Sequence, residues 1–349
     1  MSDAAVQTHA TPGRAARWLR RLGLAFVWFV LVLLSLWAVA ALYIDVRLPA
    51  WRLPLATLYV VVLVAIVAKY KLHPRSALLW LACFCLVLAW WFRLKPTNSA
   101  DWQADVDRPA WVERNGDRLL IHNLRNCDYR TETDYSNCWS DREESLSDLR
   151  GGDLFFTTWG VRWIGHPILS FQFGDGQHIA FSIEARYKGS QDYSAILGFF
   201  RQYELIFVVA DERDVIRLRT NFRKDEEVFL YRTRMDPETA RAIFLTYVDY
   251  LNQLKDRPEW YNALTRNCTT AIDKQIAADI ADPHPWNYQF LLNGTLDKLL
   301  YDRGRLVTDG LPFPELKSRA HINAAARAAD NSPDFSSLVR AGRPGFENN

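Results

Sequence analysis

Apolar residues gather in three long blocks within the first 92 positions of this 349-residue chain, and later positions alternate between apolar and charged residues. Residues 22–44 carry no charge and exceed the roughly 20 apolar residues that a helix needs to cross a bilayer. Residues 53–68 and 76–92 are shorter, but tryptophans near their ends are typical of membrane interfaces. The pattern predicts three transmembrane helices. The first block is too long for a cleaved signal peptide.

Basic residues set the predicted orientation of these helices. They precede the first block or separate the second from the third: Arg14, Arg17, Arg20, Arg21, Lys69, Lys71 and Arg75. The positive-inside rule places both groups in the cytoplasm, whereas the loop at 45–52 has two arginines against one aspartate. Three crossings then leave the chain from about residue 94 onward outside. We expect a multi-pass protein of the bacterial inner membrane with a periplasmic domain.

The composition divides the chain into five predicted parts. They are a cytoplasmic N-terminus (1–21), a membrane region (22–92), a linker (93–110), a periplasmic domain (111–310) and a C-terminal tail (311–349). Pro, Asn, Ser and Gly are mixed through the tail, so we expect it to be loosely ordered. The formal net charge of +2 lacks the basic excess of a nucleic-acid-binding protein, so we expect no such partner.

The periplasmic domain shows a mixed α+β pattern. Segments rich in aromatic and β-branched residues predict strands at 153–160, 166–173, 177–184, 203–210 and 227–233. Asp236 and Pro237 are typical of a helix start, and this helix is predicted to run to about Leu254. The acidic runs at 211–214 and 225–227 alternate with arginines, which is usual for solvated, salt-bridged surfaces.

Cysteines support the exported location. Cys127 and Cys138 flank a polar, turn-rich stretch of ten residues, which is long enough to close a disulfide loop in an oxidising compartment. A metal site is the alternative, but no second Cys or His pair at ligand spacing accompanies them. We therefore predict a disulfide, no metal and no cofactor.

Cys268 is the candidate nucleophile. It lies where a turn containing Arg266 and Asn267 gives way to a helical pattern, with isoleucines recurring every four residues. A helix N-terminus stabilises a thiolate, Arg266 adds positive charge, and the free backbone N–H groups could also hold an oxyanion. Arg266, Asn267 and Thr269 are therefore supporting residues. The alternative is that Cys268 is a small buried hydrophobe.

His166 is the candidate base for this thiol. It opens the first of two predicted strands that are joined by the turn Gly174-Asp175-Gly176. If the loop has these three residues, Glu184 lies directly across from His166, as an orienting carboxylate would. A two-residue loop would put Ala185 there instead.

His178 is the rival base. By the same register it faces Gln172 at the other end of the hairpin, and a histidine without a chemical role is the alternative reading there. His166 could likewise be a purely structural residue at a strand start.

A series of ordered motifs resembles the Lnb N-terminal periplasmic domain family over about residues 110–290. The motifs are YRTETDY (129–135), GHPILSFQFGDG (165–176), SIEAR (182–186), FFRQYELIFVVADERD (199–214), LRTNFR (218–223) and YNALTRNCTT (261–270). The family is similar in layout to the permuted papain-like NlpC and lecithin:retinol acyltransferase group, in which a strand-borne His precedes a helix-borne Cys. The order of His166 and Cys268 agrees with that layout. Three preceding spans and the Cys127/Cys138 pair depart from the family pattern.

The resemblance implies an antiparallel-sheet, papain-like α+β domain and cysteine acyl-transfer chemistry. In the Lnb branch it further implies an acyl donor from membrane phospholipid and a lipoprotein N-terminus as acceptor. We therefore expect a membrane-anchored acyltransferase or hydrolase of the cell envelope with Cys268, His166 and Glu184 as catalytic residues. The alternative is a non-catalytic scaffold that binds an envelope lipoprotein or a cell-wall component.

The predicted topology can be tested with reporter fusions. A reporter that is active only when exported should be active when it is fused after residue 100. A reporter fused at Lys71 should instead report a cytoplasmic position. The physical reason is the positive charge of the loop around Lys71. The reverse pattern would contradict the orientation.

Overall fold

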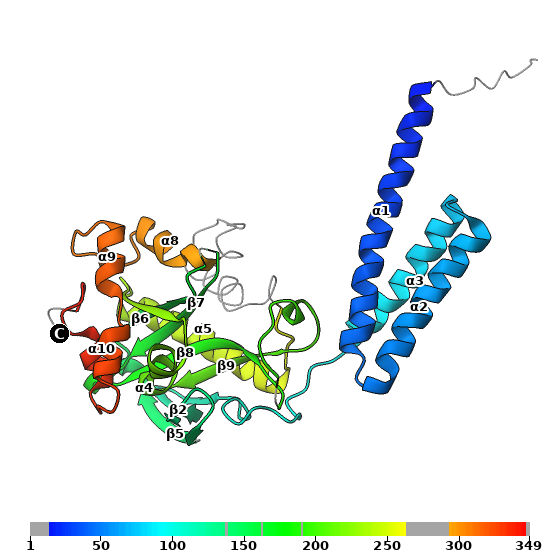
Figure 1. Cartoon of the computed structure of the whole chain (residues 1–349). Helices are drawn as coiled ribbons and strands as arrows, with labels where there is room; N and C mark the ends of the chain where they lie inside the picture. Colours follow the sequence, from blue (N-terminus) through cyan, green and yellow to red (C-terminus); the bar gives the residue numbers. More distant parts are fainter. Residues whose placement is uncertain (1–13, 137–138, 162, 190, 263–292, 347–349) are drawn as a thin grey trace, which may run out of the picture. The chain divides into compact units, whose positions relative to one another are not determined.

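The computed structural model describes residues 14–136, 139–161, 163–189, 191–262 and 293–346 (Figure 1). The chain divides into two compact units, Met1–Lys95 and Pro96–Asn349.

The first unit consists of three helices that are long and apolar enough to cross a membrane: α1 (Arg14–Asp45), α2 (Pro49–Tyr70) and α3 (Pro74–Phe92). Proline at the first helical position starts both α2 and α3, where its missing N–H costs nothing. Ser35 of α1 lies within hydrogen-bond distance of Tyr59 of α2 and accepts from Trp80 of α3. The three predicted helices are confirmed, each with additional residues.

The second unit is built on a mostly antiparallel sheet. Its strand order is β1-β2-β9-β8-β7-β6-β10, and the β2–β9 pair is parallel. Outside this order, β5 pairs with β2 in an antiparallel arrangement. The strands are β1 (Trp111–Asn115), β2 (Arg118–Arg125), β5 (Trp139–Ser145), β6 (Gly151–Thr158), β7 (Gly165–Gln172), β8 (His178–Arg186), β9 (Glu204–Ala210) and β10 (Glu227–Arg232). Two short strands, β3 (Asp128–Tyr129) and β4 (Tyr135–Ser136), pair separately. The predicted α+β class is confirmed.

The β7–β8 hairpin has the three-residue loop that the sequence suggested. Gln172 pairs with His178 and Ile168 with Ser182, and the Phe173 N–H donates to the Gln177 carbonyl at 2.8 Å. Gly176 closes the turn with φ of +72°, a conformation that favours glycine. The alternative two-residue loop is therefore excluded.

The two faces of the sheet carry different cores. On one face, Phe171 and Phe181 pack edge-on against Phe244 of α5 (Pro237–Asp256), with ring centroids 5.2 and 5.7 Å apart. Asp236 caps this helix by accepting from the Thr239 N–H at 2.7 Å, as predicted. On the other face, buried residues such as Ile168 and Ala180 belong to a core shared with the C-terminal segment.

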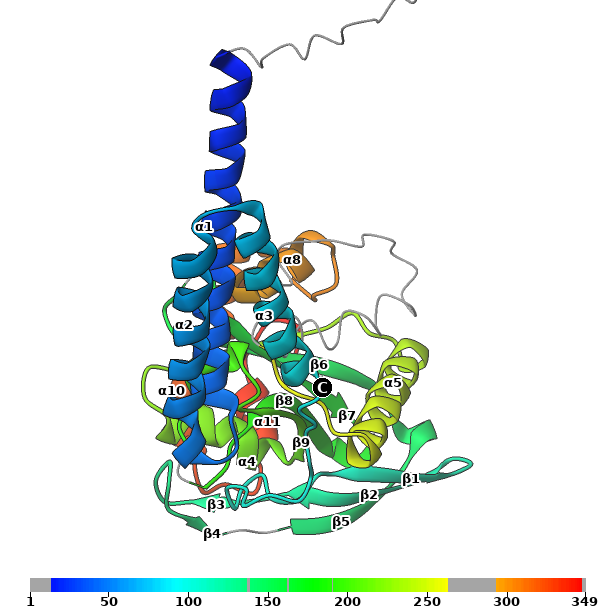
Figure 2. The same cartoon turned by 90° about the vertical axis from the view of Figure 1, so that its right-hand side faces the viewer.

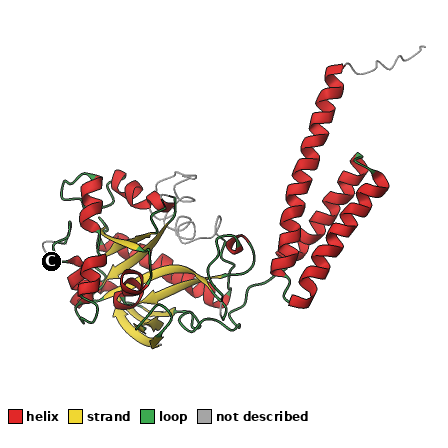
Figure 3. Ribbon diagram, in the orientation of Figure 1, coloured by secondary structure: helices red, strands yellow, loops and turns green. Residues whose placement is uncertain are grey.

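Helices therefore cover both sides of the sheet (Figure 3). Figure 2 shows α5 on one side of β7, β8 and β9, and α4 (Glu212–Arg217), α10 (Asn323–Ala328) and α11 (Phe335–Arg340) on the other. Two further helices, α8 (Leu296–Asp302) and α9 (Phe313–Ala320), pack with Phe156 and Tyr231 of β6 and β10.

The C-terminal segment corrects the expectation of a loosely ordered tail at 311–349. Its described part contains α9, α10 and α11, and Ile322, Phe335 and Val339 are buried in the sheet core. Arg340 is buried and pairs with Asp153 of β6 at 2.9 Å and with Glu212 of α4 at 2.6 Å. The local composition suggested disorder. It could not reveal these partners, because they lie far away in the sequence.

The expected linker at 93–110 is also corrected. From Pro96 onward the chain belongs to the soluble unit. The Thr97 N–H donates to the Glu204 carboxylate at 2.5 Å, and Trp102 is buried. The guanidinium of Arg186 donates to the carbonyls of Val106 and Asp107, each at 2.7 Å. These contacts explain why a polar, apparently featureless stretch is ordered.

The acidic runs are solvated only in part, since Asp225 and Glu227 are exposed, as expected. Glu212 and Asp214 are buried, and Asp214 pairs with Arg125 at 2.7 Å and accepts from the Cys127 N–H at 2.6 Å. Glu226 is buried beside Arg219. Alternation of charges indicated ion pairs correctly but could not indicate that they lie inside the fold.

Arg340→Ala should lower the free energy of unfolding of the soluble unit by about 3–5 kcal/mol, because two buried carboxylates lose their shared cation. Urea unfolding of the full chain in detergent, followed by tryptophan fluorescence, measures this. Arg319→Ala is the matched control, since its pair with Glu315 is exposed and should contribute about 0.5 kcal/mol or less. Equal effects of the two substitutions would contradict the anchoring role of Arg340.

Candidate active site

His166 occupies a buried position at the start of β7. It pairs with Thr157 of β6 on one side, and the residue is only 6% exposed. Counting two residues outward from the Ile168–Ser182 pair brings Glu184 of β8 opposite it. The imidazole Nε2 lies 3.2 Å from Glu184 Oε1 and 2.8 Å from the Ser182 hydroxyl. The predicted pairing of His166 with Glu184 is confirmed as geometry.

Ser182 determines which ring nitrogen carries the proton. Its hydroxyl donates to Glu184 Oε1 at 2.6 Å, so its oxygen is left to accept from the His166 Nε2–H. The neutral imidazole assigned from this network therefore has its lone pair on Nδ1. This is the arrangement in which a histidine, oriented through one nitrogen, takes a proton at the other.

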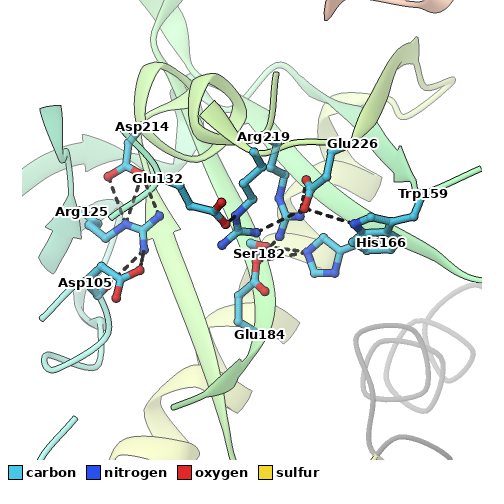
Figure 4. Close-up of polar contacts among 11 residues, drawn as sticks. Asp105, Arg125, Glu132, Trp159, His166, Ser182, Glu184, Asp214, Arg219 and Glu226 are labelled. Carbon is cyan, nitrogen blue, oxygen red and sulfur yellow. Dashed lines mark hydrogen bonds and ion pairs between the residues drawn. The ribbon is translucent and has the colours of Figure 1, made fainter. Parts of the chain in front are cut away.

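Arg219 joins this group to a second carboxylate. It comes from the π-helical turn Leu218–Phe222 that follows α4, and it donates to Glu184 at 2.6 Å and to Glu226 at 3.0 Å. The Trp159 indole donates to Glu226 at 3.3 Å. Figure 4 shows these side chains converging: Trp159 follows β6, His166 comes from β7, Ser182 and Glu184 from β8, Arg219 from the π-helical turn and Glu226 from the residue before β10. π-helical turns of this kind are frequent at functional sites.

Residues 135–294 match the family model described as the Lnb N-terminal periplasmic domain. This segment of the chain belongs to that family. No curated protein and no solved structure matched the chain. The matched segment contains His166, Ser182, Glu184 and Arg219. Together with the three helices that are long and apolar enough to cross a membrane, the match indicates a membrane protein with a periplasmic domain.

The electrostatics of the Lnb N-terminal domain keep Glu184 ionised. Burial raises the pKa of this carboxyl, but His166 and Arg219 outweigh burial and hold it well below its usual range. Burial lowers the pKa of Arg219, and the carboxylates of Glu226 and Glu184 raise it further than burial lowers it. A fixed carboxylate beside the imidazole stabilises the positive charge that the ring acquires on taking a proton.

His178 lies at the other end of the hairpin, about six residues along β8 from Glu184, a separation of roughly 20 Å. It pairs with Gln172, as expected, and its Nδ1–H donates to the Gly176 carbonyl at 2.9 Å. It takes no part in the described group around His166. This position favours His166 over His178 as the candidate base.

Several predicted residues fall outside the described part of the chain. They are Cys268, Arg266, Asn267, Thr269 and Cys138. Cys127 is described and buried next to β3. The nucleophile, its supporting residues, the disulfide and the papain-like placement of a cysteine-bearing helix therefore stay predictions.

Ser182, Arg219 and Glu226 were missed as site residues in the sequence. The sequence could have indicated Ser182, because it is two residues from Glu184 and therefore projects from the same face of β8. No local pattern in the sequence indicated Arg219 or Glu226, since the packing of the π-helical turn on the sheet brings them into the group around His166.

Replacing Arg219 tests the charge balance of the site. A carboxyl with a lowered pKa stabilises the fold above its unfolded-state pKa, and this contribution is lost as the pH falls through the folded-state value. Arg219→Met removes one cation that lowers the pKa of Glu184, so acid unfolding should begin at a higher pH. Arg219→Lys keeps the charge and should shift the midpoint less.

Tryptophan fluorescence during acid titration of the full chain in detergent measures both midpoints. If Arg219→Met unfolds at the same pH as the unchanged chain, Glu184 does not depend on Arg219.

Proposed function

We propose that this protein is a periplasmic cysteine acyltransferase or hydrolase of the inner membrane that forms a thioester on Cys268. The observation that carries the proposal is the His166 imidazole, held through Nε2 by Ser182 and Glu184 with its lone pair on Nδ1. A structural histidine needs only one partner, whereas a base needs a fixed tautomer and a neighbouring carboxylate.

The proposed reaction has two steps. His166 Nδ1 takes the Cys268 thiol proton, and the thiolate attacks the carbonyl carbon of a lipid ester. The carbon–oxygen bond then breaks, the imidazolium returns the proton to the leaving alcohol, and a thioester remains on Cys268. An amine, such as a lipoprotein N-terminus, or water then attacks the thioester and releases the thiol. Glu184 orients the ring and stabilises its positive charge without itself being protonated.

The surroundings of His166 support an apolar substrate. The β6–β7 connection immediately before His166 exposes Trp159, Val161 and Ile164. Exposed clusters of large apolar residues mark binding surfaces. Three apolar helices in the same chain, with the predicted inside-positive loops, would hold this site next to membrane phospholipid.

The alternative is a non-catalytic scaffold for an envelope lipoprotein or a cell-wall component. Buried ion pairs also occur where they have no chemical role, and the pair of Arg219 with Glu226 would serve a scaffold equally well. The fixed tautomer of His166 favours the enzyme, because a scaffold does not depend on which nitrogen is protonated.

Substitutions at the three candidate catalytic residues test the assignment. Cys268→Ala should abolish acyl-enzyme formation, and His166→Ala should slow it by about 10²–10⁴-fold through loss of the general base. Glu184→Gln should do less harm, since the orienting group does not take the proton. Mass spectrometry of the full chain after incubation with phospholipid vesicles detects the acyl adduct.

His178→Ala is the matched control and should retain most activity, because its side chain faces the far end of the hairpin. Acyl transfer by Cys268→Ala would end the enzyme hypothesis in this form. Loss of activity in His178→Ala with activity retained in His166→Ala would show that the base is at the other end of the hairpin.

A further inference from the structure

The β8–β9 connection presents an apolar tip on the surface of the soluble unit, in the green loop of Figure 1. Tyr193, Ile196 and Phe199 are 53%, 69% and 39% exposed. The three residues lie within seven positions of one another: Phe199 belongs to the short turn Leu197–Phe199, Ile196 directly precedes this turn, and Tyr193 lies three residues before Ile196. Ile196 is one of the most exposed large apolar residues of this unit, and contiguous exposure of this kind marks an interaction surface.

This tip is held in place by the fold. The buried Tyr203 hydroxyl donates to the Asp192 carbonyl and accepts from the Ser194 N–H, both at 2.9 Å. The Gly198 N–H donates to the Ser194 carbonyl at 3.0 Å. These hydrogen bonds, together with the contact of the Tyr193 ring with Tyr203, hold the backbone that carries the exposed side chains.

The same connection is tied to the segment that leaves the membrane. The Gln103 N–H donates to the Tyr187 carbonyl at 3.1 Å, and the Gln103 side chain donates to the Gln191 carbonyl at 2.8 Å. The Gly189 N–H donates to the Asp101 carbonyl at 2.8 Å. The apolar tip thus belongs to the part of the fold that holds residues 101–103.

The chain allows the soluble unit little distance from the bilayer. The last transmembrane helix ends at Phe92, and Thr97 is already bonded to Glu204 of β9. Five residues of extended chain reach at most about 18 Å. Thr97 therefore stays within about this distance of the end of α3.

We propose that the β8–β9 connection is a membrane-docking loop that inserts Tyr193, Ile196 and Phe199 into the interfacial region of the anchoring bilayer. Aromatic and aliphatic side chains at this depth bury apolar area, and a tyrosine keeps its hydroxyl among the headgroups. The bilayer is the proposed occupant because the tether between Phe92 and Thr97 is short and the β8–β9 connection is bonded to residues 101–103, which follow it directly. Docking at this point fixes how the soluble unit is oriented on the membrane.

Photo-crosslinking in the full chain tests this proposal. The residue at 196 is replaced by a benzophenone amino acid (Ile196→p-benzoylphenylalanine) in a Cys268→Ala background, so that acyl transfer plays no part. The chain is reconstituted in phospholipid nanodiscs and irradiated, and lipid adducts are counted by mass spectrometry. Leu338→p-benzoylphenylalanine is the matched control, because Leu338 is an exposed apolar residue of α11 in the C-terminal segment.

The lipid adduct yield at 196 should exceed that at 338 by at least about tenfold, in line with burial of one apolar side chain. Adding Phe199→Asp to the chain with the crosslinker at 196 should reduce that yield several-fold, and an unchanged thermal midpoint shows that the fold is kept. Equal yields at 196 and 338, adducts only to protein, or no response to Phe199→Asp would each overturn the proposal.

Discussion

The ion pair between Glu184 and Arg219 is the interaction on which the rest of the site depends. A carboxylate buried without a partner costs several kcal/mol, and Glu184 has a guanidinium at 2.6 Å and an imidazole at 3.2 Å. The same guanidinium compensates Glu226. Because the carboxylate stays ionised, it can orient His166 through Ser182 and can stabilise a positive charge on the ring.

The two faces of the sheet differ in the kind of side chains that they carry: one is aromatic, and the other bears buried polar and charged groups. The face toward α5 is packed with phenylalanine and tyrosine rings in edge-on contacts, which demand no charge compensation. The opposite face carries His166, Ser182 and Glu184 at one end, and a second ion-pair group, Glu212 with Arg340, at the other. The aromatic face supplies the rigid support that keeps polar side chains on the other face in one geometry.

The soluble unit is linked to the membrane by a very short segment that is itself part of the fold. Arg186 of β8 binds the carbonyls of Val106 and Asp107, and it is two residues from Glu184 on the same strand. The strand that bears the orienting carboxylate therefore also holds the juxtamembrane segment. The proposed site at this strand and the proposed membrane-docking loop in the connection that follows the strand are compatible with this arrangement.

The sequence by itself determined the features that depend on local pattern. Three apolar helices, the cap at Asp236, the strand segments and the three-residue hairpin loop all follow from short-range rules, since period, length and turn residues are local properties. The pairing of His166 with Glu184 followed from that loop, because register propagates along a hairpin.

Only the tertiary structure decided which charges lie inside. Arg219 and Glu226 joined the site, Arg340 anchored the C-terminal segment, and Thr97 bound Glu204, each across a long stretch of sequence. A charged residue on a buried face looks the same in the sequence as one on a solvated face. Its burial depends on whether a distant partner arrives to compensate the charge, and that is settled by the packing of helices on the sheet.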